Sequence, residues 1–578
     1  MIVLRNLILT CGAAWMIAAA CPADAATPRP LTIERLYSLP SIIGTRPENP
    51  QWSPDSRRLA FLWNDEGTNF RDVWIADARG GKPVRITSMP RPENPPNPGS
   101  DVAQLQRVAR AESDPGVSEL VWAPDGRHLV FVVHGALYQV LPGQPAQRLG
   151  SDDTSASQIA ASIRARSIAY LSAGNLWTAD LAGSKPAFRK IRSRANRDVE
   201  VESFVWSDDG ARLAFIETDA SQVPTRGIPD YLGESSRLID VKRPYPGEPS
   251  ESRRLGVVAT SGGDVQWMDL GDNLLEPIFG VRWSPDGTHL LVDKSDLYVK
   301  DRRLLVLDVD TGRSHALVRE INPKNVTAEW WAEWAPDGRG VYFTSDRDND
   351  YHVYFQSLEG GEPKAMTAGP WAVFSASLSP AAHALFVVTN AGNAESRRVS
   401  RVPLDGGPPE LLTQAEGAHR PSVSPDGTLL ADLHSNDVTP PDLYLQSANR
   451  PSAKAPIVRQ VTHSPVPEFT DYHWVAAKYV VFPNVNDGTP LHARLTLPPD
   501  FDPAKKYPAI LGLAYSNTVH DVSLSGHLPG RRRWRAGHQP LPRAHRRNAD
   551  HDGAAETRSA VRTVIGIHAL GALAGHLM

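Results

Sequence analysis

One short phrase recurs along the chain and limits its possible folds more than any other feature. The phrase is Trp, then Ser or Ala, then Pro or Asp, then Asp, then Gly or Ser, and full copies begin at Trp52, Trp122, Trp206, Trp283 and Trp334. Three weaker copies begin near Ile163, Leu378 and Val423. Five of the seven intervals between these eight starts are 41–51 residues long, which is the repeat length of β-propeller blades.

Each repeat also has the composition of a small antiparallel sheet. Its Pro-Asp-Gly core is turn chemistry, because Pro fixes φ, Asp hydrogen-bonds nearby backbone and Gly accepts positive φ. An apolar run such as Leu129–Val133 follows, then a second strand such as His352–Phe355 and a short strand ending in Thr. One such sheet cannot bury both faces, so neighbouring units must stack around an axis.

We therefore predict a mainly β chain with a β-propeller over residues 51–462, preceded by a leading segment at 26–50. Eight blades are predicted, and seven are possible. We interpret the repeated Trp and Asp residues as blade packing and turn residues rather than ligand contacts. Two longer intervals, at 88–118 and 217–255, are insertions. Insertions in a regular repeat often carry binding contacts, and plain solvated loops are the other interpretation.

Residues 1–25 have the organisation of a secretory signal peptide. A basic residue near the start precedes the apolar run Leu7–Ala20, and Ala23-Asp24-Ala25 fits a cleavage site. The apolar run is shorter than the ~20 residues a membrane span needs, and no later stretch has 18 consecutive apolar residues. We expect an exported protein, periplasmic or secreted, with no membrane span. Lipidation at Cys21 is the alternative, and Cys11 is the one other cysteine.

Composition narrows the classes of partner. Lys and Arg number 61 and Asp and Glu 65, a formal net charge of −4. This gives no overall positive field of the kind that nucleic-acid binding needs. We expect no nucleic-acid partner, no cofactor and no metal, and the sequence leaves the oligomeric state open.

Residues 203–258 add an ordered series of motifs to the repeat. The turn at 206–210 is followed by Leu213-Ala214-Phe215, Val223-Pro224, Arg243-Pro244-Tyr245-Pro246 and Arg254-Leu255-Gly256-Val257-Val258. The series resembles the propeller of the prolyl oligopeptidase clan and, within it, of the dipeptidyl peptidase IV family. Ser345–Asp348 with His352–Tyr354 is similar to a later blade of that family. The resemblance runs from about residue 32 to 519 and implies a serine peptidase with peptide substrates.

Residues 463–519 resemble the start of that family's α/β-hydrolase domain. Phe469–Trp474 looks like the crossing from the propeller, residues 487–498 suggest strand-turn-strand, and 509–515 suggest a buried strand. The resemblance puts Tyr515 near the family's oxyanion-hole tyrosine, whose phenol stabilises developing negative charge. A core or surface tyrosine is the other interpretation.

The rest of the family's chemistry is not found in the sequence. It needs a nucleophilic Ser in a Gly-x-Ser-x-Gly elbow, followed by Asp and His, and that elbow occurs nowhere in the 578 residues. Tyr515 is therefore the single catalytic candidate, because the nucleophile Ser, the Asp and the His are not present. The resemblance thus implies an incomplete hydrolase domain and an inactive chain.

Residues 520–578 differ from the rest in composition. They hold seven His and nine Arg but no Lys, Phe or Tyr. We interpret them as an aberrant, disordered tail translated in a shifted reading frame. A natural basic tail and a His-rich metal tract around His538, His545 and His551 are the alternatives.

One specificity feature of the family is also missing. Dipeptidyl peptidase IV enzymes hold the substrate's free amine with an acidic pair on a short inserted helix. Residues 198–203 instead alternate like a strand, as Asp-Val-Glu-Val-Glu-Ser. Release of dipeptides is therefore not predicted.

Together these patterns favour an exported member of the dipeptidyl peptidase IV family that is truncated inside its catalytic domain. The alternative is a non-catalytic, TolB-like propeller that acts as a binding protein, and a regulatory pseudo-enzyme is a third hypothesis. Residues 463–519 favour the first, because a stand-alone propeller has no need of a hydrolase-like segment.

Overall fold

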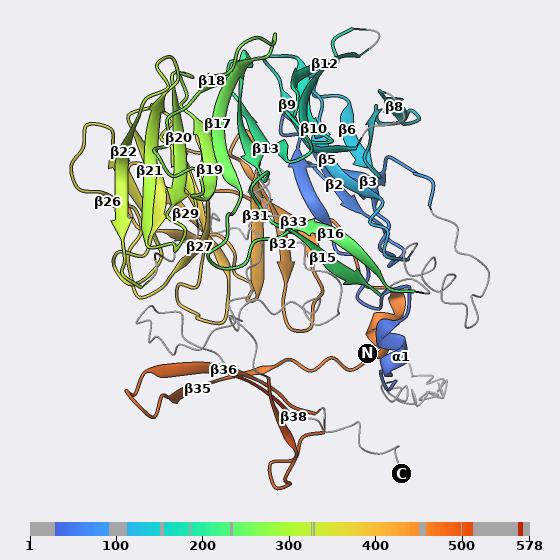
Figure 1. The fold of residues 1–578 in the computed structure, drawn as a ribbon. Coiled ribbons are helices and arrows are strands. Elements are labelled where there is room, and N and C mark those ends of the chain that lie inside the picture. The colour runs from blue at the N-terminus through green and yellow to red at the C-terminus, as the bar shows by residue number, and fades with distance from the viewer. Residues whose placement is uncertain are drawn as a thin grey trace, which may run out of the picture.

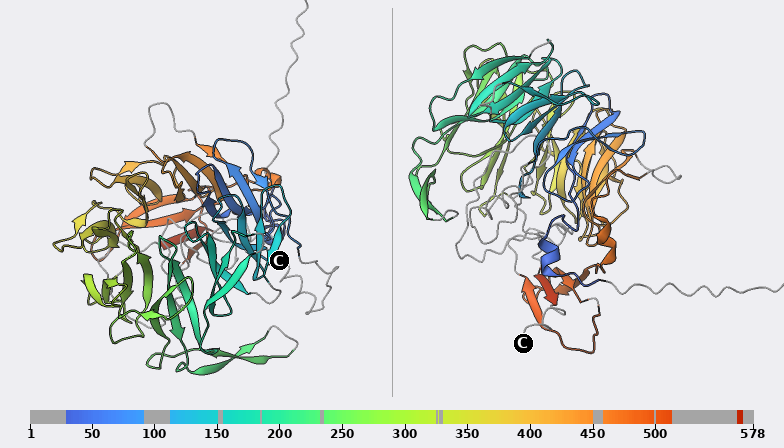
Figure 2. Two further views of the ribbon diagram at one scale, coloured as in Figure 1. Left: turned by 90° about the horizontal axis from the view of Figure 1, so that it is seen from above. Right: turned by 90° about the vertical axis from the view of Figure 1, so that its right-hand side faces the viewer.

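The computed structural model describes residues 29–91, 112–150, 155–183, 186–231, 235–324, 326, 330–449, 458–498, 500–512 and 565–569. Within these ranges eight four-stranded antiparallel sheets follow one another in chain order around a ring (Figures 1 and 2). The first strands of successive sheets contact each other, so they lie innermost. The prediction of a mainly β chain with an eight-bladed propeller is confirmed.

Blades 1 to 4 each take four strands in order from the centre outwards. Their bounds are β1 Glu48–Trp52, β2 Arg58–Trp63, β3 Asp72–Asp77 and β4 Val84–Arg85; β5 Val117–Trp122, β6 Leu129–Val133, β7 Ala136–Val140 and β8 Gln147–Leu149; β9 Ala156–Ser162, β10 Ser167–Ser172, β11 Asn175–Asp180 and β12 Ala187–Arg192; β13 Val199–Trp206, β14 Arg212–Asp219, β17 Ser252–Ala259 and β18 Gln266–Trp267. A two-stranded hairpin, β15 Thr225–Asp230 with β16 Arg237–Lys242, is inserted in blade 4.

Blades 5 to 8 continue the pattern. Their bounds are β19 Ile278–Trp283, β20 His289–Ser295, β21 Asp301–Asp308 and β22 Ser314–Ile321; β23 Ala332–Trp334, β24 Gly340–Ser345, β25 His352–Ser357 and β26 Lys364–Ala365; β27 Val373–Ser379, β28 Ala384–Thr389, β29 Arg398–Pro403 and β30 Glu410–Leu411; β31 Ala418–Val423, β32 Leu429–Ser435, β33 Asp442–Ser447 and β34 Arg459–Gln460.

The repeated tryptophans join neighbouring blades. Each indole N–H donates to a backbone carbonyl in the first strand of the preceding blade, as in Trp122 to Gln51 at 2.9 Å and Trp283 to Val205 at 3.3 Å. Trp52 donates to the carbonyl of Ser422 at 3.0 Å, which links blade 1 back to blade 8. A buried indole N–H needs such an acceptor. Each repeated tryptophan therefore joins its own blade to the preceding one.

The repeated Ser and Asp fix the turn between the first and second strands. In blade 5 the Ser284 hydroxyl donates to Asp286 at 2.6 Å and accepts from the amide of His289 at 2.9 Å. Asp286 also accepts from the amide of Thr288 at 3.0 Å. The Ser284 hydrogen bond and this amide lower the pKa of Asp286 to about 2. These residues are turn residues, as the sequence predicted.

The hydrophobic core is divided among the seams between blades. Eight clusters of buried side chains occur in the described residues, and each combines residues of two adjacent blades. The ring closes through one of them, in which Phe61 and Trp63 of blade 1 pack with Leu433 and Leu443 of blade 8. Because blades 1 and 8 share no strand, closure depends on side-chain packing and on hydrogen bonds such as those of Trp52 with Ser422 and of Arg459 with the Asp77 and Gly81 carbonyls.

Two segments outside the ring lie below it in Figure 1. The helix α1 Ile33–Tyr37 precedes blade 1, and the 3-10 turn η1 Pro467–Asp471 follows blade 8. Beyond η1 a sheet with strand order β35-β36-β38-β37 is built from Lys478–Pro483, Pro490–Thr496, Ile565–Ala569 and Ala509–Gly512.

Strand β38 is the one described part of residues 520–578, so the interpretation of that segment as an aberrant, disordered tail stays a prediction. Strand β38, Ile565–Ala569, pairs parallel with β36 and antiparallel with β37. Its apolar, partly β-branched sequence suits a strand. It also supplies hydrogen-bond partners to the edge of Ala509–Gly512, which would otherwise present unpaired backbone groups.

Candidate functional site

The lower face of the ring, which carries the loops between the second and third strands of each blade, contacts β35 and β36 (Figure 1). In blade 8 the loop residue Asp437 accepts from the Tyr479 hydroxyl at 2.9 Å and from Arg494 at 2.9 Å. In blade 7 the loop residue Glu395 lies 2.7 Å from Nδ1 of His492. The β35–β36 hairpin is therefore docked on two adjacent blades by polar contacts.

The chain segments that enter and leave the ring are tied together at this face. Glu468 in η1 forms ion pairs with Arg29 and Arg35, both at 2.9 Å, and accepts from the Tyr472 hydroxyl at 2.6 Å. These hydrogen bonds lower the pKa of Glu468. The contact holds the start of the hairpin segment against the N-terminal helix, so both lie beneath blades 8 and 1.

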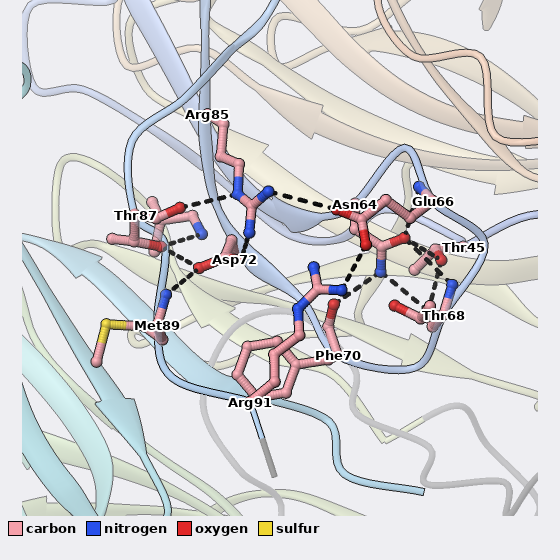
Figure 3. Close-up of polar contacts among 11 residues, drawn as sticks. Thr45, Asn64, Glu66, Thr68, Phe70, Asp72, Arg85, Thr87, Met89 and Arg91 are labelled. Atoms are coloured by element: carbon pink, nitrogen blue, oxygen red, sulfur yellow. Dashed lines mark hydrogen bonds and ion pairs between the residues drawn. The ribbon is translucent and has the colours of Figure 1, made fainter. Parts of the chain in front are cut away.

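A polar network in blade 1 fixes the start of the first insertion at the same face (Figure 3). The buried carboxylate of Asp72 accepts from the Thr87 hydroxyl at 2.8 Å and from the amide of Met89 at 3.0 Å. Arg91 is ion-paired with Glu66, and this contact lowers the pKa of Glu66. The remainder of the insertion, from residue 92 to 111, lies outside the described residues.

β-Bulges occur near the lower end of the inner strands in several blades. One extra residue interrupts the register at Ser118, Glu202, Phe279 and Phe374. A bulge bends the strand and re-aims a side chain, and such bulges are common beside functional sites. They therefore bend the lower ends of these inner strands.

The lower end of the inner strand of blade 4 carries two acidic residues. Glu200 is exposed and Glu202 is half-buried. The Glu202 carboxylate accepts from the Thr218 hydroxyl at 2.6 Å and from Arg253 at 3.2 Å. Both glutamates lie in β13, so the predicted strand at 198–203 is present from Val199 onward.

Aromatic side chains at two of these bulges, Phe279 and Phe374, make close contacts in blades 5 to 7. Phe279 stacks on Trp330 with ring centroids 4.0 Å apart, and the Arg302 guanidinium lies 4.9 Å from the Trp330 ring. In blade 7 the Arg397 guanidinium lies 3.2 Å from the centre of the Phe374 ring.

Arg302 is held by a buried ionic network. Its side chain is 1% exposed and donates to Asp293 at 2.7 and 3.0 Å and to Glu320 at 3.1 Å. It also donates to the carbonyl of Thr344. Burial opposes its charge, but the two carboxylates outweigh that effect and raise the pKa of Arg302. The stacked pair Phe279–Trp330 therefore lies beside a cation, Arg302, whose position is fixed by its ion pairs.

A buried histidine lies in blade 8, close to the Asp437 loop. Nδ1 of His419 is 2.6 Å from Asp432, and its Nε2 is 2.9 Å from the carbonyl of Ala415. Both neighbours are acceptors, so both ring nitrogens carry protons. Burial disfavours the charged imidazolium, but the hydrogen bond and the negative charge of Asp432 together have the larger effect and raise the pKa of His419. His434 stacks on His419 at 4.4 Å, and burial together with the His419 charge lowers the pKa of His434.

The second insertion forms an exposed arm on the lower side of blade 4 (Figure 1). Leu238 is 70% exposed and Ile239 44%. At its base Arg226 pairs with Glu248 and lies 3.8 Å from the centre of the Tyr245 ring.

The catalytic candidate from the sequence, Tyr515, lies outside the described residues, as do His538, His545 and His551. The described residues contain no group of three or more His, Cys, Asp or Glu placed to hold a metal ion. No helix in the described part is long and apolar enough to cross a membrane. Sequence reasoning missed the docking residues Glu395 and Asp437, because no local pattern connects them to a hairpin that follows them in the chain.

Comparison with known proteins agrees with this architecture. Residues 200–441 match the family described as the dipeptidyl peptidase IV N-terminal region. "Probable dipeptidyl-aminopeptidase B" of Emericella nidulans is 26% identical over 352 residues, 53% of this chain and 37% of the relative. "Uncharacterized peptidase YuxL" of Bacillus subtilis is 31% identical over 126 residues, 20% of this chain and 18% of the relative.

The solved structure of Porphyromonas gingivalis dipeptidyl peptidase 4 has the same fold. It aligns with a TM-score of 0.65 and 16% identity, covering 83% of this chain and 69% of that one. The alignment to the fungal relative spans little more than a third of that relative's length. The resemblance inferred from the sequence is confirmed, because part of the propeller matches the dipeptidyl peptidase IV N-terminal region and the chain is similar to these relatives.

Proposed function

We propose that this dipeptidyl peptidase IV family chain uses its propeller to admit and hold peptides for a hydrolase domain that begins with the β35–β36 hairpin. The observation that carries the proposal is the docking of that hairpin on blades 7 and 8 through Asp437 and Glu395. It puts the hairpin against the lower face of the ring, so a peptide held at that face would lie beside the segment that follows.

The chain of 578 residues does not cleave peptides by itself. Ser-His-Asp catalysis needs a nucleophile in an activated geometry, and the sequence offers no Gly-x-Ser-x-Gly elbow. Purified protein incubated with dipeptide and oligopeptide amides is expected to release no product above buffer. Cleavage abolished by a serine-directed inhibitor would overturn this.

Export is the second part of the proposal and rests on residues 1–25. Cell fractionation with tagged protein is expected to recover it outside the cytoplasm, with Ala26 as the new N-terminus. Recovery of the unprocessed chain in the cytoplasm would contradict it, and processing at Cys21 would favour a lipoprotein.

A non-catalytic binding propeller is the second candidate, favoured by the apolar arm β15–β16 with its exposed Leu238 and Ile239. The two functions predict different dependence of peptide binding on the docked hairpin at the lower face of the ring. If the chain is only a binding protein, replacing Asp437 and Glu395 should leave peptide binding unchanged, whereas the peptidase-type arrangement predicts that it weakens.

A further inference from the structure

Strands β31 and β32 of blade 8 bring two histidines face to face. His419 and His434 are direct partners in the strand register, and their rings stack with centroids 4.4 Å apart. Nε2 of His419 donates to the carbonyl of Ala415 at 2.9 Å. Nε2 of His434 donates to the carbonyl of Glu416 at 3.0 Å. Both rings therefore hold one turn, residues 415–417.

The same turn holds the loop of blade 7 that docks the hairpin. The Gly417 carbonyl accepts from the backbone amide of Arg397 at 2.8 Å. The Glu416 carboxylate accepts from the Asn393 side chain at 2.9 Å. Glu395, which contacts β36, lies between these two anchored loop residues in the chain. The position of Glu395 therefore depends on the turn, and the turn depends on the two histidines.

The titratable and charged groups that face the two rings come from β32, β33, the turn and blade 7. They are Asp432, Asp442, Tyr444, Glu416 and Arg398. The Asp442 carboxylate is held by the Thr462 and Ser464 hydroxyls, at 2.6 Å in both cases. Despite burial, the contacts with Asp432 favour the charge of His419, whereas burial and that charge disfavour a charge on His434. Near pH 6.5 the pair therefore holds one charged and one neutral ring.

We propose that the His419–His434 pair is a two-sided pH switch, which keeps the β35–β36 hairpin docked only while one ring is charged and the other neutral. The inference rests on the proposed function for the role of the docked hairpin, and it adds a control over the docking. Acid and alkali both act on the turn at 415–417, through different rings.

Acid releases the turn through His434. A second proton on the pair would place two imidazolium rings 4.4 Å apart, where like charges repel. His434 is half-buried, so its ring can turn into solvent, and the hydrogen bond to Glu416 is then lost. Burial and the His419 charge lower the pKa of His434. Docking is therefore weakened as the pH falls from the ordinary value of 6.5 towards the lower folded value.

Alkali releases the turn through His419. When this ring loses one proton it keeps the proton on Nδ1, because the Asp432 carboxylate is the stronger acceptor. The lone pair of Nε2 then faces the Ala415 carbonyl, so two acceptors meet without a proton between them. The pKa of His419 is raised. Its contribution is therefore complete below about pH 6.5 and is lost as the pH rises through the folded value.

Hydrogen exchange of the 578-residue protein, followed from about two pH units below 6.5 to about two above, tests the switch. The measured quantity is the protection factor of amides in β36, which is the exchange rate of a free peptide divided by the observed rate at the same pH. Protection is expected to be greatest near pH 6.5 and to fall on both sides, by at most about tenfold for each pH unit, because one proton acts on each limb. Protection that is flat, or that changes in one direction only, overturns the proposal.

Two variants assign the limbs. His434→Gln keeps a donor for Glu416 but cannot be charged, so it should remove the acid limb alone. His419→Gln should remove the alkaline limb and also weaken the acid limb, because the charge that repels protonated His434 is gone. His383→Asn is the matched control, since His383 is an exposed histidine in the turn between β27 and β28, at the other end of blade 7, and it should leave the curve unchanged. A histidine-pair variant that keeps both limbs at full size overturns the assignment.

Two further measurements separate the switch from its neighbours. His492→Asn keeps a donor for Glu395 without a titrating ring, so protection should be lower overall while both limbs remain. Loss of both limbs in this variant would place the titration in the docking contact itself and overturn the proposal. Calorimetric binding of the tetrapeptide amide Ala-Pro-Ala-Ala at the same pH values tests the proposed function separately. Binding that ignores the state of the hairpin would refute that function and leave the switch standing.

Discussion

Asp437→Ala should release the β35–β36 hairpin from the propeller without unfolding blade 8. The carboxylate accepts from the Tyr479 hydroxyl and from Arg494. Both hydrogen bonds involve a charged group, and such bonds contribute about 1.5–3 kcal/mol each. The Arg494 and Asp437 side chains are 15% and 11% exposed, so solvent screens their contact only weakly and the lower end of this range is a minimum. The expected loss of docking free energy is about 3 kcal/mol.

Hydrogen exchange measures this loss directly. A change of about 3 kcal/mol raises the population of the undocked hairpin about a hundredfold, so amides of Lys478–Pro483 and Pro490–Thr496 should exchange up to about a hundredfold faster. The Glu395–His492 contact remains in the variant and still holds the hairpin to blade 7, so the acceleration of exchange is limited. Asp437→Asn retains an acceptor but loses the charge, and it should give a smaller acceleration.

The control is Asp405→Asn, which removes the charge of an exposed carboxylate whose partner His383 is also exposed. It should leave hairpin exchange unchanged. Equal exchange in Asp437→Ala and the native protein would refute the docking assignment. Equal acceleration in β32 and β33 would show that Asp437 stabilises blade 8 rather than the hairpin contact.

Three further perturbations test the fold. Arg302→Met leaves two carboxylates uncompensated in a buried site and should cost about 3–5 kcal/mol, measured by chemical denaturation; a cost below about 1 kcal/mol would contradict the network. The raised pKa of His419 means that its stabilising contribution is complete below about pH 6.5 and is lost as the pH rises through the higher folded value. His419→Gln should therefore flatten the fall in melting temperature above that pH, and an unchanged slope would count against the ion pair with Asp432. Gly44→Ala should destabilise by about 2–4 kcal/mol, because φ is +73° and a Cβ there would overlap the backbone of Ser464. Gly80→Ala, where no atom lies within 4 Å, should cost less in the same melting assay.

Most of the architecture could be predicted from local pattern. The phrase at Trp283–Gly287 contains its own turn chemistry, so one repeat is enough to place a turn between two strands. The strand at Val199–Trp206 followed from alternation alone. The functional surface could not be predicted in this way. Glu395 and His492 are far apart in sequence, and Ile565–Ala569 gave no signal of pairing with β36 and β37, because pairing depends on which strand edges are left open.

The strands and turns of each blade could be predicted from local sequence, because their contacts join residues close along the chain. The number of repeats and the family resemblance could be read from the same short motifs. Which charged side chains form ion pairs between distant parts of the chain depends on the folded structure. Arg35 precedes the propeller and Glu468 follows it, and the closure of the ring brings them into an ion pair at 2.9 Å. Glu395 and Asp437 become docking residues for the same reason: the chain returns beneath the blades that carry them. Closing a ring joins positions that no sequence window contains, and Coulomb interactions depend on distance in space.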